Sequence, residues 1–206
     1  MDIGNLATIA AAFFVAAASP GPATIAVASV SINSDRKSGL VFGLGLAVGL
    51  AVWGLVAAAG LGAILQTSNV ALTALKVLGG IYLLWLAFKS ARAATTSRHI
   101  SPNSQDKRRH FFYGLVLNLS NPKAVFAWMA ALALGLNAGS GAGQVALATG
   151  ICMCLGFLIY SVYAFAFSTP GAMLVYSRAR RWVDGAVAGL FAVAGIALIK
   201  SAFARQ

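Results

Sequence analysis

Hydrophobic positions fill this chain in six long runs, and short polar connectors separate them. The runs cover about residues 4–32, 39–65, 70–91, 111–135, 144–168 and 183–203. A helix needs about 20 apolar residues to cross the hydrocarbon core of a bilayer, and each run is long enough. The pattern therefore predicts an all-α polytopic membrane protein, in which residues 1–206 form a single transmembrane domain of six helices.

Two of the six runs are interrupted by prolines. The first run contains "ASPGPATIAV" (18–27) and the fourth contains "SNPKAVFAW" (120–128). Proline removes a hydrogen bond from a helix interior, but it is tolerated at the first position of a new helix. We therefore expect spans one and four to be broken or kinked, with new helical segments beginning near Pro22 and Pro122.

The breaks fall at corresponding places in the two halves of the chain, since each lies in the first of three spans. The third spans also match weakly, "LGGIYLLWLAFKSAR" (78–92) with "VAGIALIKSAFAR" (193–205). An odd number of spans in each half makes the halves enter the membrane from opposite faces. We interpret them as an inverted repeat, with repeat one at 1–93, a cytoplasmic linker at 94–110 and repeat two at 111–206.

Composition and charge support a membrane protein and predict its orientation. The chain is 60% hydrophobic and 9% charged, whereas soluble domains are about a quarter charged. Its net charge is +11, and most of its 15 Lys and Arg lie in connectors one, three and five, while connectors two (66–69) and four (136–143) have none. Lys200 and Arg205 near the C-terminus oppose this alternation but are outnumbered. The positive-inside rule then predicts cytoplasmic basic loops and external termini, and no nucleic-acid partner is expected.

Polar groups gather at the two breaks. Inversion would direct the N-terminus of each new helical segment to the membrane centre, where each carries about half a positive charge. Lys123 adds a full charge there and needs a protein interior or a water-filled cavity. We predict a carboxylate site at mid-membrane, to which Ser19, Asn118, Ser120 and Asn121 bring hydroxyls and amides. The alternative is that the prolines are packing kinks and Lys123 bonds carbonyls that the kinks free.

Coupling must work with few acids. The chain has only Asp2, Asp35, Asp106 and Asp184, and none is expected at mid-bilayer, so a carboxylate relay is not expected. We hypothesise that Lys123 carries the proton. Asp184 is either a gate that pairs with Arg180 or Arg181, or a helix N-terminal acid.

No cofactor, metal site or catalytic constellation is expected, so the chain is not predicted to be an enzyme. Cys152 and Cys154 lie two positions apart, and on a helix they would point about 200° away from each other. They suit neither a disulfide nor a shared metal, and we interpret them as small buried hydrophobes. His99 and His110 in the linker are too sparse for a metal site.

Five stretches in order along the chain match a known family: "SPGPA" (19–23), "GLVFGLGLAVG" (39–49), "LKVLGGIYLLWLA" (75–87), "GLVLNLSNPKA" (114–124) and "VDGAVAGLFAVAGIAL" (183–198). The chain resembles the LysE/RhtB family of bacterial amino-acid exporters. The resemblance implies secondary-active efflux across the bacterial inner membrane, driven by the membrane potential or a proton gradient. Lys76 matches a basic position of the family. The proline motifs of the family correspond to Ser19, Pro20, Gly21, Pro22, Asn121, Pro122 and Lys123.

The expected substrate is a small neutral amino acid or a derivative, such as a threonine- or homoserine-like solute. A second ammonium would have no carboxylate to meet, which disfavours basic amino acids. A passive channel or an exporter of another small metabolite stays open as an alternative, with a membrane-embedded redox protein more remote. Glycines four residues apart allow close helix contact, either within the monomer or in a homodimer. The other partner is the lipid bilayer.

Overall fold

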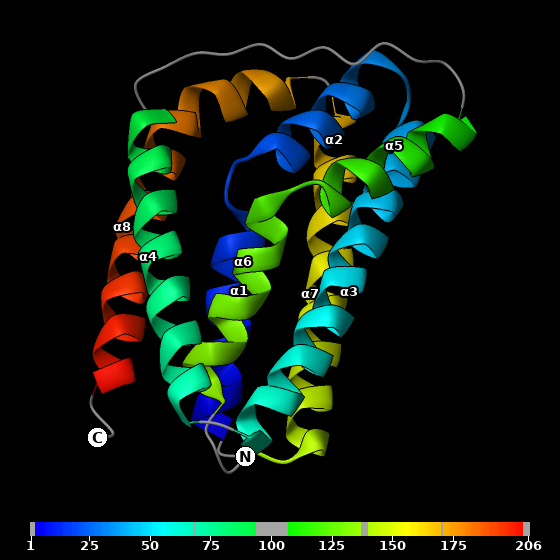
Figure 1. The fold of residues 1–206 in the computed structure, drawn as a ribbon. Helices are drawn as coiled ribbons and strands as arrows, with labels where there is room; N and C mark the ends of the chain where they lie inside the picture. The colour runs from blue at the N-terminus through cyan, green and yellow to red at the C-terminus, as the bar shows by residue number, and fades with distance from the viewer. Residues whose placement is uncertain (1–2, 68, 94–106, 137–139, 170, 204–206) are drawn as a thin grey trace.

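The chain folds into a bundle of helices that stand side by side (Figure 1). The structure is a computed structural model and describes residues 3–67, 69–93, 107–136, 140–169 and 171–203. Within these ranges the regular structure is helical throughout. The helices are α1 (Ile3–Ala18), α2 (Pro22–Asn33), α3 (Arg36–Thr67), α4 (Asn69–Ala93), α5 (Lys107–Leu119), α6 (Pro122–Gly135), α7 (Ala142–Phe167) and α8 (Ala172–Phe203).

Several of these helices can cross a membrane. By length and hydropathy, α3 over Arg36–Gly60, α7 over its full length and α8 over Arg181–Phe203 qualify singly. α1 and α2 qualify together as one span that is bent by 57° at the break between them. α6 is apolar but shorter. The described ranges are thus those of a helical membrane protein, and the arrangement of six spans in two inverted repeats stays a prediction.

Both predicted breaks are present. α1 ends at Ala18 and α2 begins at Pro22, while α5 ends at Leu119 and α6 begins at Pro122. Each proline occupies the start of its helix, where a missing N–H is least costly. Asn121 caps α6, because its side-chain Oδ1 accepts a hydrogen bond from the backbone N of Lys123 at 3.1 Å.

The breaks do not lie halfway along the bundle. α1 has 16 residues and α6 has 14, which at about 1.5 Å per residue gives lengths of about 24 Å and about 21 Å. α1 runs from the end of the bundle that holds the chain termini up to its break, and α6 returns beside it (Figure 1). Since α5 is inclined to α6, its residues add less depth than a straight span would, and the breaks lie toward the opposite end of the bundle.

The connectors are more helical than the hydrophobic pattern predicted, and the predicted linker 94–110 already includes the first residues of α5, which begins at Lys107. The fifth and second connectors show the difference as well. The fifth was expected at 169–182, but α8 already begins at Ala172, and its first turns lie across one end of the bundle (Figure 1). In the second, α3 continues to Thr67 and α4 begins at Asn69. Hydropathy detects the part of a helix that suits lipid and not the turns that extend beyond it. Gly171 has φ +83°, a left-handed conformation that favours glycine in the turn between α7 and α8.

Close helix crossings hold the bundle together on both sides of α1 and α6. α3 packs against α5 and α7 on one side, and α4 packs against α8 on the other (Figure 1). A Cβ on Gly45 of α3 would collide with the backbone oxygen of Phe111 in α5. Likewise, a Cβ on Gly80 of α4 would lie 2.9 Å from the backbone oxygen of Gly195 in α8. Glycine at these positions lets the helix backbones touch.

The basic helix ends share one end of the bundle. The start of α3, the end of α4, the start of α5 and the first turns of α8 all lie there, and both chain termini lie at the opposite end (Figure 1). This grouping agrees with the alternation of charged and uncharged connectors along the sequence. Which of the two ends faces the cytoplasm stays a prediction from the positive-inside rule.

Candidate functional site

The two helix breaks lie next to each other. The Lys123 Nζ at the start of α6 donates a hydrogen bond to the backbone oxygen of Ser19, 104 residues away, at 2.5 Å. A Cβ placed on Gly21 would lie 3.2 Å from the same Nζ. The N-termini of α2 and α6 therefore share one region with a lysine ammonium. The first N–H groups of a helix have no partner inside the helix itself, and in α6 one of them, the Lys123 N–H, bonds the Asn121 Oδ1 instead.

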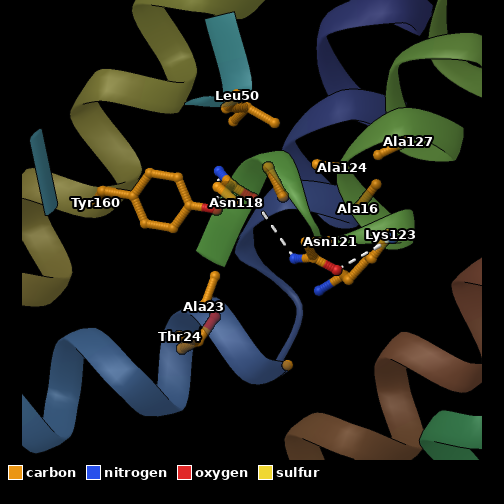
Figure 2. A pocket seen from close by; sticks show the side chains of 12 residues that line it. Ala16, Ala23, Thr24, Leu50, Asn118, Asn121, Lys123, Ala124, Ala127 and Tyr160 are labelled. Atoms are coloured by element: carbon orange, nitrogen blue, oxygen red, sulfur yellow. Dashed lines mark hydrogen bonds between the residues drawn. The ribbon is translucent and has the colours of Figure 1, made fainter. Parts of the chain in front are cut away.

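A pair of asparagines connects this region to the surrounding helices. The Asn118 side chain is completely buried, and its Nδ2 donates to the backbone oxygen of Leu46 at 2.6 Å and to the Tyr160 hydroxyl at 3.3 Å. The Asn121 Nδ2 in turn donates to the Asn118 Oδ1 at 3.4 Å (Figure 2). Through these amides the break between α5 and α6 is joined to α3 and α7.

Side chains from other helices bond the backbone carbonyls that the breaks free. The Tyr163 hydroxyl donates to the Ala18 oxygen, and the Trp53 Nε1 donates to the Leu119 oxygen at 3.1 Å. The Lys123 ammonium bonds the Ser19 oxygen in the same way. A buried carbonyl without a partner is costly, so these contacts stabilise both breaks. Lys123 thus bonds a carbonyl at a break, as expected if the prolines are packing kinks.

A small cavity lies between the two breaks (Figure 2). Its walls are Ala16, Ala17, Gly21, Ala23, Thr24, Leu50, Asn118, Asn121, Lys123, Ala124, Ala127 and Tyr160. The free space of about 10 Å³ is close to the minimum that holds one water molecule. We refer to it as the break cavity. In this conformation it is too small for an amino acid, so a solute of that size would need the helices around it to separate.

The structure brings together some of the predicted binding residues and not others. Gly21, Asn118, Asn121 and Lys123 line the break cavity, and Ser19 contacts Lys123. The remaining predicted residues do not line it: Pro20 is half-buried, whereas Pro22, Ser120 and Pro122 are exposed. Two of these prolines start helices, so their backbone serves the site while their rings face outward. Ser120 precedes the cap residue and is directed away from the cavity.

The predicted coupling residues are buried in different places. Lys76 in α4 is 6% exposed but does not line the break cavity. Asp184 in α8 is 2% exposed and lies within electrostatic range of Lys123. The sequence had suggested either a gate in which Asp184 pairs with Arg180 or Arg181, or an acid at a helix N-terminus. The second alternative is wrong, because α8 begins at Ala172 and Asp184 lies well inside it. Arg181 is exposed, and the side chain of Arg180 lies outside the described residues. Asp184 therefore lies nearer to Lys123, one of the predicted binding residues, than the sequence indicated.

Comparison with known proteins identifies the family. Residues 14–202, which include both breaks, match the family model described as LysE type translocator. The chain belongs to the LysE family. No solved structure matches it.

Relatives of this LysE-family chain carry transport names. It is 33% identical to the threonine efflux protein of Salmonella typhi over 201 residues, which are 94% of this chain and 97% of the relative. The threonine efflux protein of Escherichia coli (strain K12) gives the same identity and coverage. The leucine efflux protein of Enterobacter sp. (strain 638) is 35% identical over 127 residues, 59% of this chain and 58% of the relative.

Sequence reasoning missed several residues of the site in this LysE-family protein. Thr24 and Tyr160 line the break cavity, and Tyr163 bonds a carbonyl at the first break. The two tyrosines lie three positions apart in a largely apolar run, which places them on one face of α7. That spacing was available in the sequence. Contact of this face with the breaks was not, because it depends on how α7 packs against α1 and α2.

Proposed function

We propose that this protein is a secondary-active exporter of small neutral amino acids or their derivatives across the bacterial inner membrane. The observation that carries the proposal is the contact between the two breaks, in which the Lys123 ammonium meets the Ser19 carbonyl beside the N-termini of α2 and α6. Helix N-termini and a lysine attract a carboxylate. A substrate carboxylate would replace the Ser19 oxygen as the acceptor of the lysine hydrogen bond.

The small size of the break cavity supports alternating access. At about 10 Å³ it excludes an amino acid, so binding requires a second conformation in which the two breaks move apart. In the conformation described here, the bond between Lys123 and Ser19 joins the two halves of the chain. Exchange of that bond for one to the substrate would open the cavity on one side of the membrane. A carrier has such states because its site faces one side at a time.

The proposed coupling uses Lys123 and Asp184. Both belong to the second half of the chain, and the Asp184 carboxylate lies within electrostatic range of the Lys123 ammonium. Asp184 is buried and Lys123 is half-buried, and an opposite charge nearby lowers the cost of removing either group from water. A substrate carboxylate that bonds Lys123 would weaken its interaction with Asp184, and that change would link binding to proton or charge movement. Asp184 also offers an opposite charge to the α-ammonium of the substrate.

The substrate class follows from the charges near the site and from the named relatives. One lysine and one aspartate balance the carboxylate and ammonium of a neutral amino acid, which leaves no partner for a charged side chain. The relatives are named for efflux of threonine and leucine, and a further relative of Salmonella typhi for efflux of homoserine and homoserine lactone. All of these are neutral or derived from neutral amino acids.

The membrane topology that we propose has six spans, as two inverted repeats of three, with both termini outside. Three observations support it: the two breaks are adjacent, α3 packs against α7, and α4 packs against α8. In the proposed repeat these pairs are the second spans of the two halves and the third spans. A two-fold axis in the membrane plane would relate the members of each pair.

Exchange in proteoliposomes tests the function. Purified protein reconstituted with internal threonine should take up external labelled threonine faster than empty vesicles do. Lys123→Gln should lower this exchange at least tenfold, because the substrate carboxylate loses the positively charged partner that donates a hydrogen bond to it. Lys89→Gln is the matched control: Lys89 is exposed, lies over the Trp85 ring at 4.4 Å, and should leave exchange within twofold.

A passive channel is the alternative, with an exporter of another small metabolite beside it. A channel would equilibrate labelled threonine at a rate that internal threonine does not stimulate. If exchange shows no stimulation, or if Lys123→Gln and Lys89→Gln behave alike, the proposed mechanism is wrong. A membrane-embedded redox protein is more remote, because Cys152 and Cys154 occupy different faces of α7. Cys152 is buried as predicted, whereas the prediction is wrong for Cys154, which is exposed.

A further inference from the structure

A second, larger cavity lies beside the break cavity. It has a free volume of about 360 Å³ and is formed between α1, α4, α6 and α8. Pockets for small-molecule ligands have volumes of roughly 300–1,000 Å³, so this one has the size of a ligand site. We refer to it as the alanine chamber, because alanines from α1, α6 and α8 make up most of its wall.

The alanine chamber adjoins the polar site. Ala16 of α1 and Ala127 of α6 line both cavities. Ala127 lies four residues beyond Lys123 on the same helix, which places the two side chains on one face, about one turn apart. A molecule whose carboxylate bonds Lys123 would therefore have its remaining atoms within reach of the chamber.

The wall chemistry of the chamber is almost entirely apolar. Ala130 and Ala131 of α6, Leu83 of α4 and Phe191 of α8 are buried around it. The one polar residue on the wall, Thr8, donates its hydroxyl hydrogen bond to the Gly4 oxygen of its own helix. A charged group would find no partner on these walls, and its burial would be costly. An aliphatic group would exchange an aqueous environment for an apolar one.

We propose that the alanine chamber binds the side chain of the transported amino acid and makes the protein selective for neutral side chains up to the size of leucine. This inference rests on the proposed function, because it needs a carboxylate at Lys123. The break cavity holds the charged groups that all amino acids share, and the chamber discriminates between their side chains. Small wall residues leave the space that a branched aliphatic group would occupy.

The outer side of the chamber opens toward lipid. Leu190 and Val193 of α8 line its rim and are 50% and 69% exposed. A lipid acyl chain is therefore the competing occupant. The continuity through Ala16 and Ala127 favours the substrate, because an acyl chain entering from the rim needs no connection to Lys123. A change in the volume of the chamber should alter selectivity among amino acids only if the substrate side chain, and not an acyl chain, occupies it.

Variants that fill the chamber test the proposal. Ala131→Leu and Ala194→Leu each add three carbon atoms to its wall, on α6 and α8. In these variants, the concentration of unlabelled leucine that inhibits threonine exchange in proteoliposomes should be at least tenfold higher than in the unmodified protein. The inhibitory concentration of unlabelled alanine should stay within twofold. A single methylene group already changes selectivity by about 10-fold or more in a well-fitted pocket. Ala188→Leu is the matched control, since Ala188 is a half-buried residue of α8 that does not line the chamber.

A variant that enlarges the chamber provides a second test if the proteins with a filled chamber do not fold. Phe191→Ala enlarges the chamber and should improve inhibition by phenylalanine relative to alanine, at least threefold. An unchanged ratio of leucine to alanine inhibition in all variants overturns the chamber proposal while threonine exchange itself supports the function. If Ala194→Leu loses contact with spin-labelled phospholipid while the ratio of leucine to alanine inhibition stays unchanged, the chamber holds an acyl chain. Absence of threonine, leucine and alanine exchange in the unmodified protein contradicts the proposed function instead.

Discussion

At the scale of single residues, the site depends on hydrogen bonds to backbone groups that the breaks expose. Asn121 accepts from the Lys123 backbone N–H and donates to Asn118, so one side chain both starts α6 and connects it to α5. Tyr163 and Lys123 bond the carbonyls at the end of α1. The polar residues in this membrane protein are therefore partly structural, and variants must separate that role from binding.

Replacement of the α6 cap should lower stability. Asn121→Ala removes the acceptor of the Lys123 N–H, and the loss of a cap costs about 0.5–2 kcal/mol. We expect a lower unfolding midpoint in detergent. Asn121→Ser keeps a cap oxygen but loses the amide that bonds Asn118, so it should retain more stability than Asn121→Ala. Equal midpoints for both variants would show that the cap contributes nothing measurable.

The Tyr163 hydroxyl should be needed for stability at the first break. Tyr163→Phe leaves the Ala18 oxygen without this donor, at a cost of about 1–3 kcal/mol for a buried group. The expected result is a fall in the free energy of unfolding in detergent. Tyr113→Phe on α5 provides a control, since Tyr113 is 55% exposed and its replacement should leave unfolding unchanged. A control that destabilises as much as the test variant would refute this explanation.

At the scale of the helices, proline and glycine have different structural roles. The prolines end two helices inside the bundle and begin two others, and the glycines let α3 approach α5 and α4 approach α8. The prolines and the glycine spacing of α3 were visible in the sequence as motifs, whereas the contact between Gly80 of α4 and Gly195 of α8 was not predicted. Only the packing assigns each glycine to a neighbour. Gly45 faces the α5 backbone, while Gly60 on the same helix has open space beside it.

These two glycines of α3 should respond to alanine with opposite signs. Gly45→Ala places a methyl group against the Phe111 oxygen, and overpacking costs about 1–3 kcal/mol. Gly60→Ala meets no neighbour and should stabilise the helix by up to about 1 kcal/mol through backbone propensity. Unfolding midpoints measured in the same detergent compare the variants. A Gly45→Ala protein as stable as the parent would mean that α3 and α5 are not in close contact.

At the scale of the whole molecule, the hydrophobic pattern predicted the class and the breaks but not the depth or the partners. Runs and prolines depend on local sequence, so the ends of α1 and α5 could be predicted to within a few residues. The early start of α8 and the burial of Asp184 near Lys123 depend on how helices that are distant in sequence pack. Pro122 is a further example, because its motif predicted where the break lies but not that the proline ring would be exposed.

The orientation of the molecule is open to direct labelling. In a background without Cys152 and Cys154, a cysteine at Ser34 lies at the basic end and one at Gly141 at the other, and both positions are exposed. The positive-inside rule predicts that a membrane-impermeant maleimide labels Gly141→Cys in intact cells and Ser34→Cys only after permeabilisation. Labelling in the reverse order would place the termini in the cytoplasm.

The glycine contacts of α3 with α5 and of α4 with α8 restrict how the molecule can move. Backbones in direct contact cannot slide past each other without steric overlap, so each pair should travel as one rigid body. Any opening then becomes a relative rotation of two blocks, with α1 and α6 between them. Spin labels placed within one block should keep a constant separation throughout the transport cycle, and only labels in different blocks should report two populations of distance.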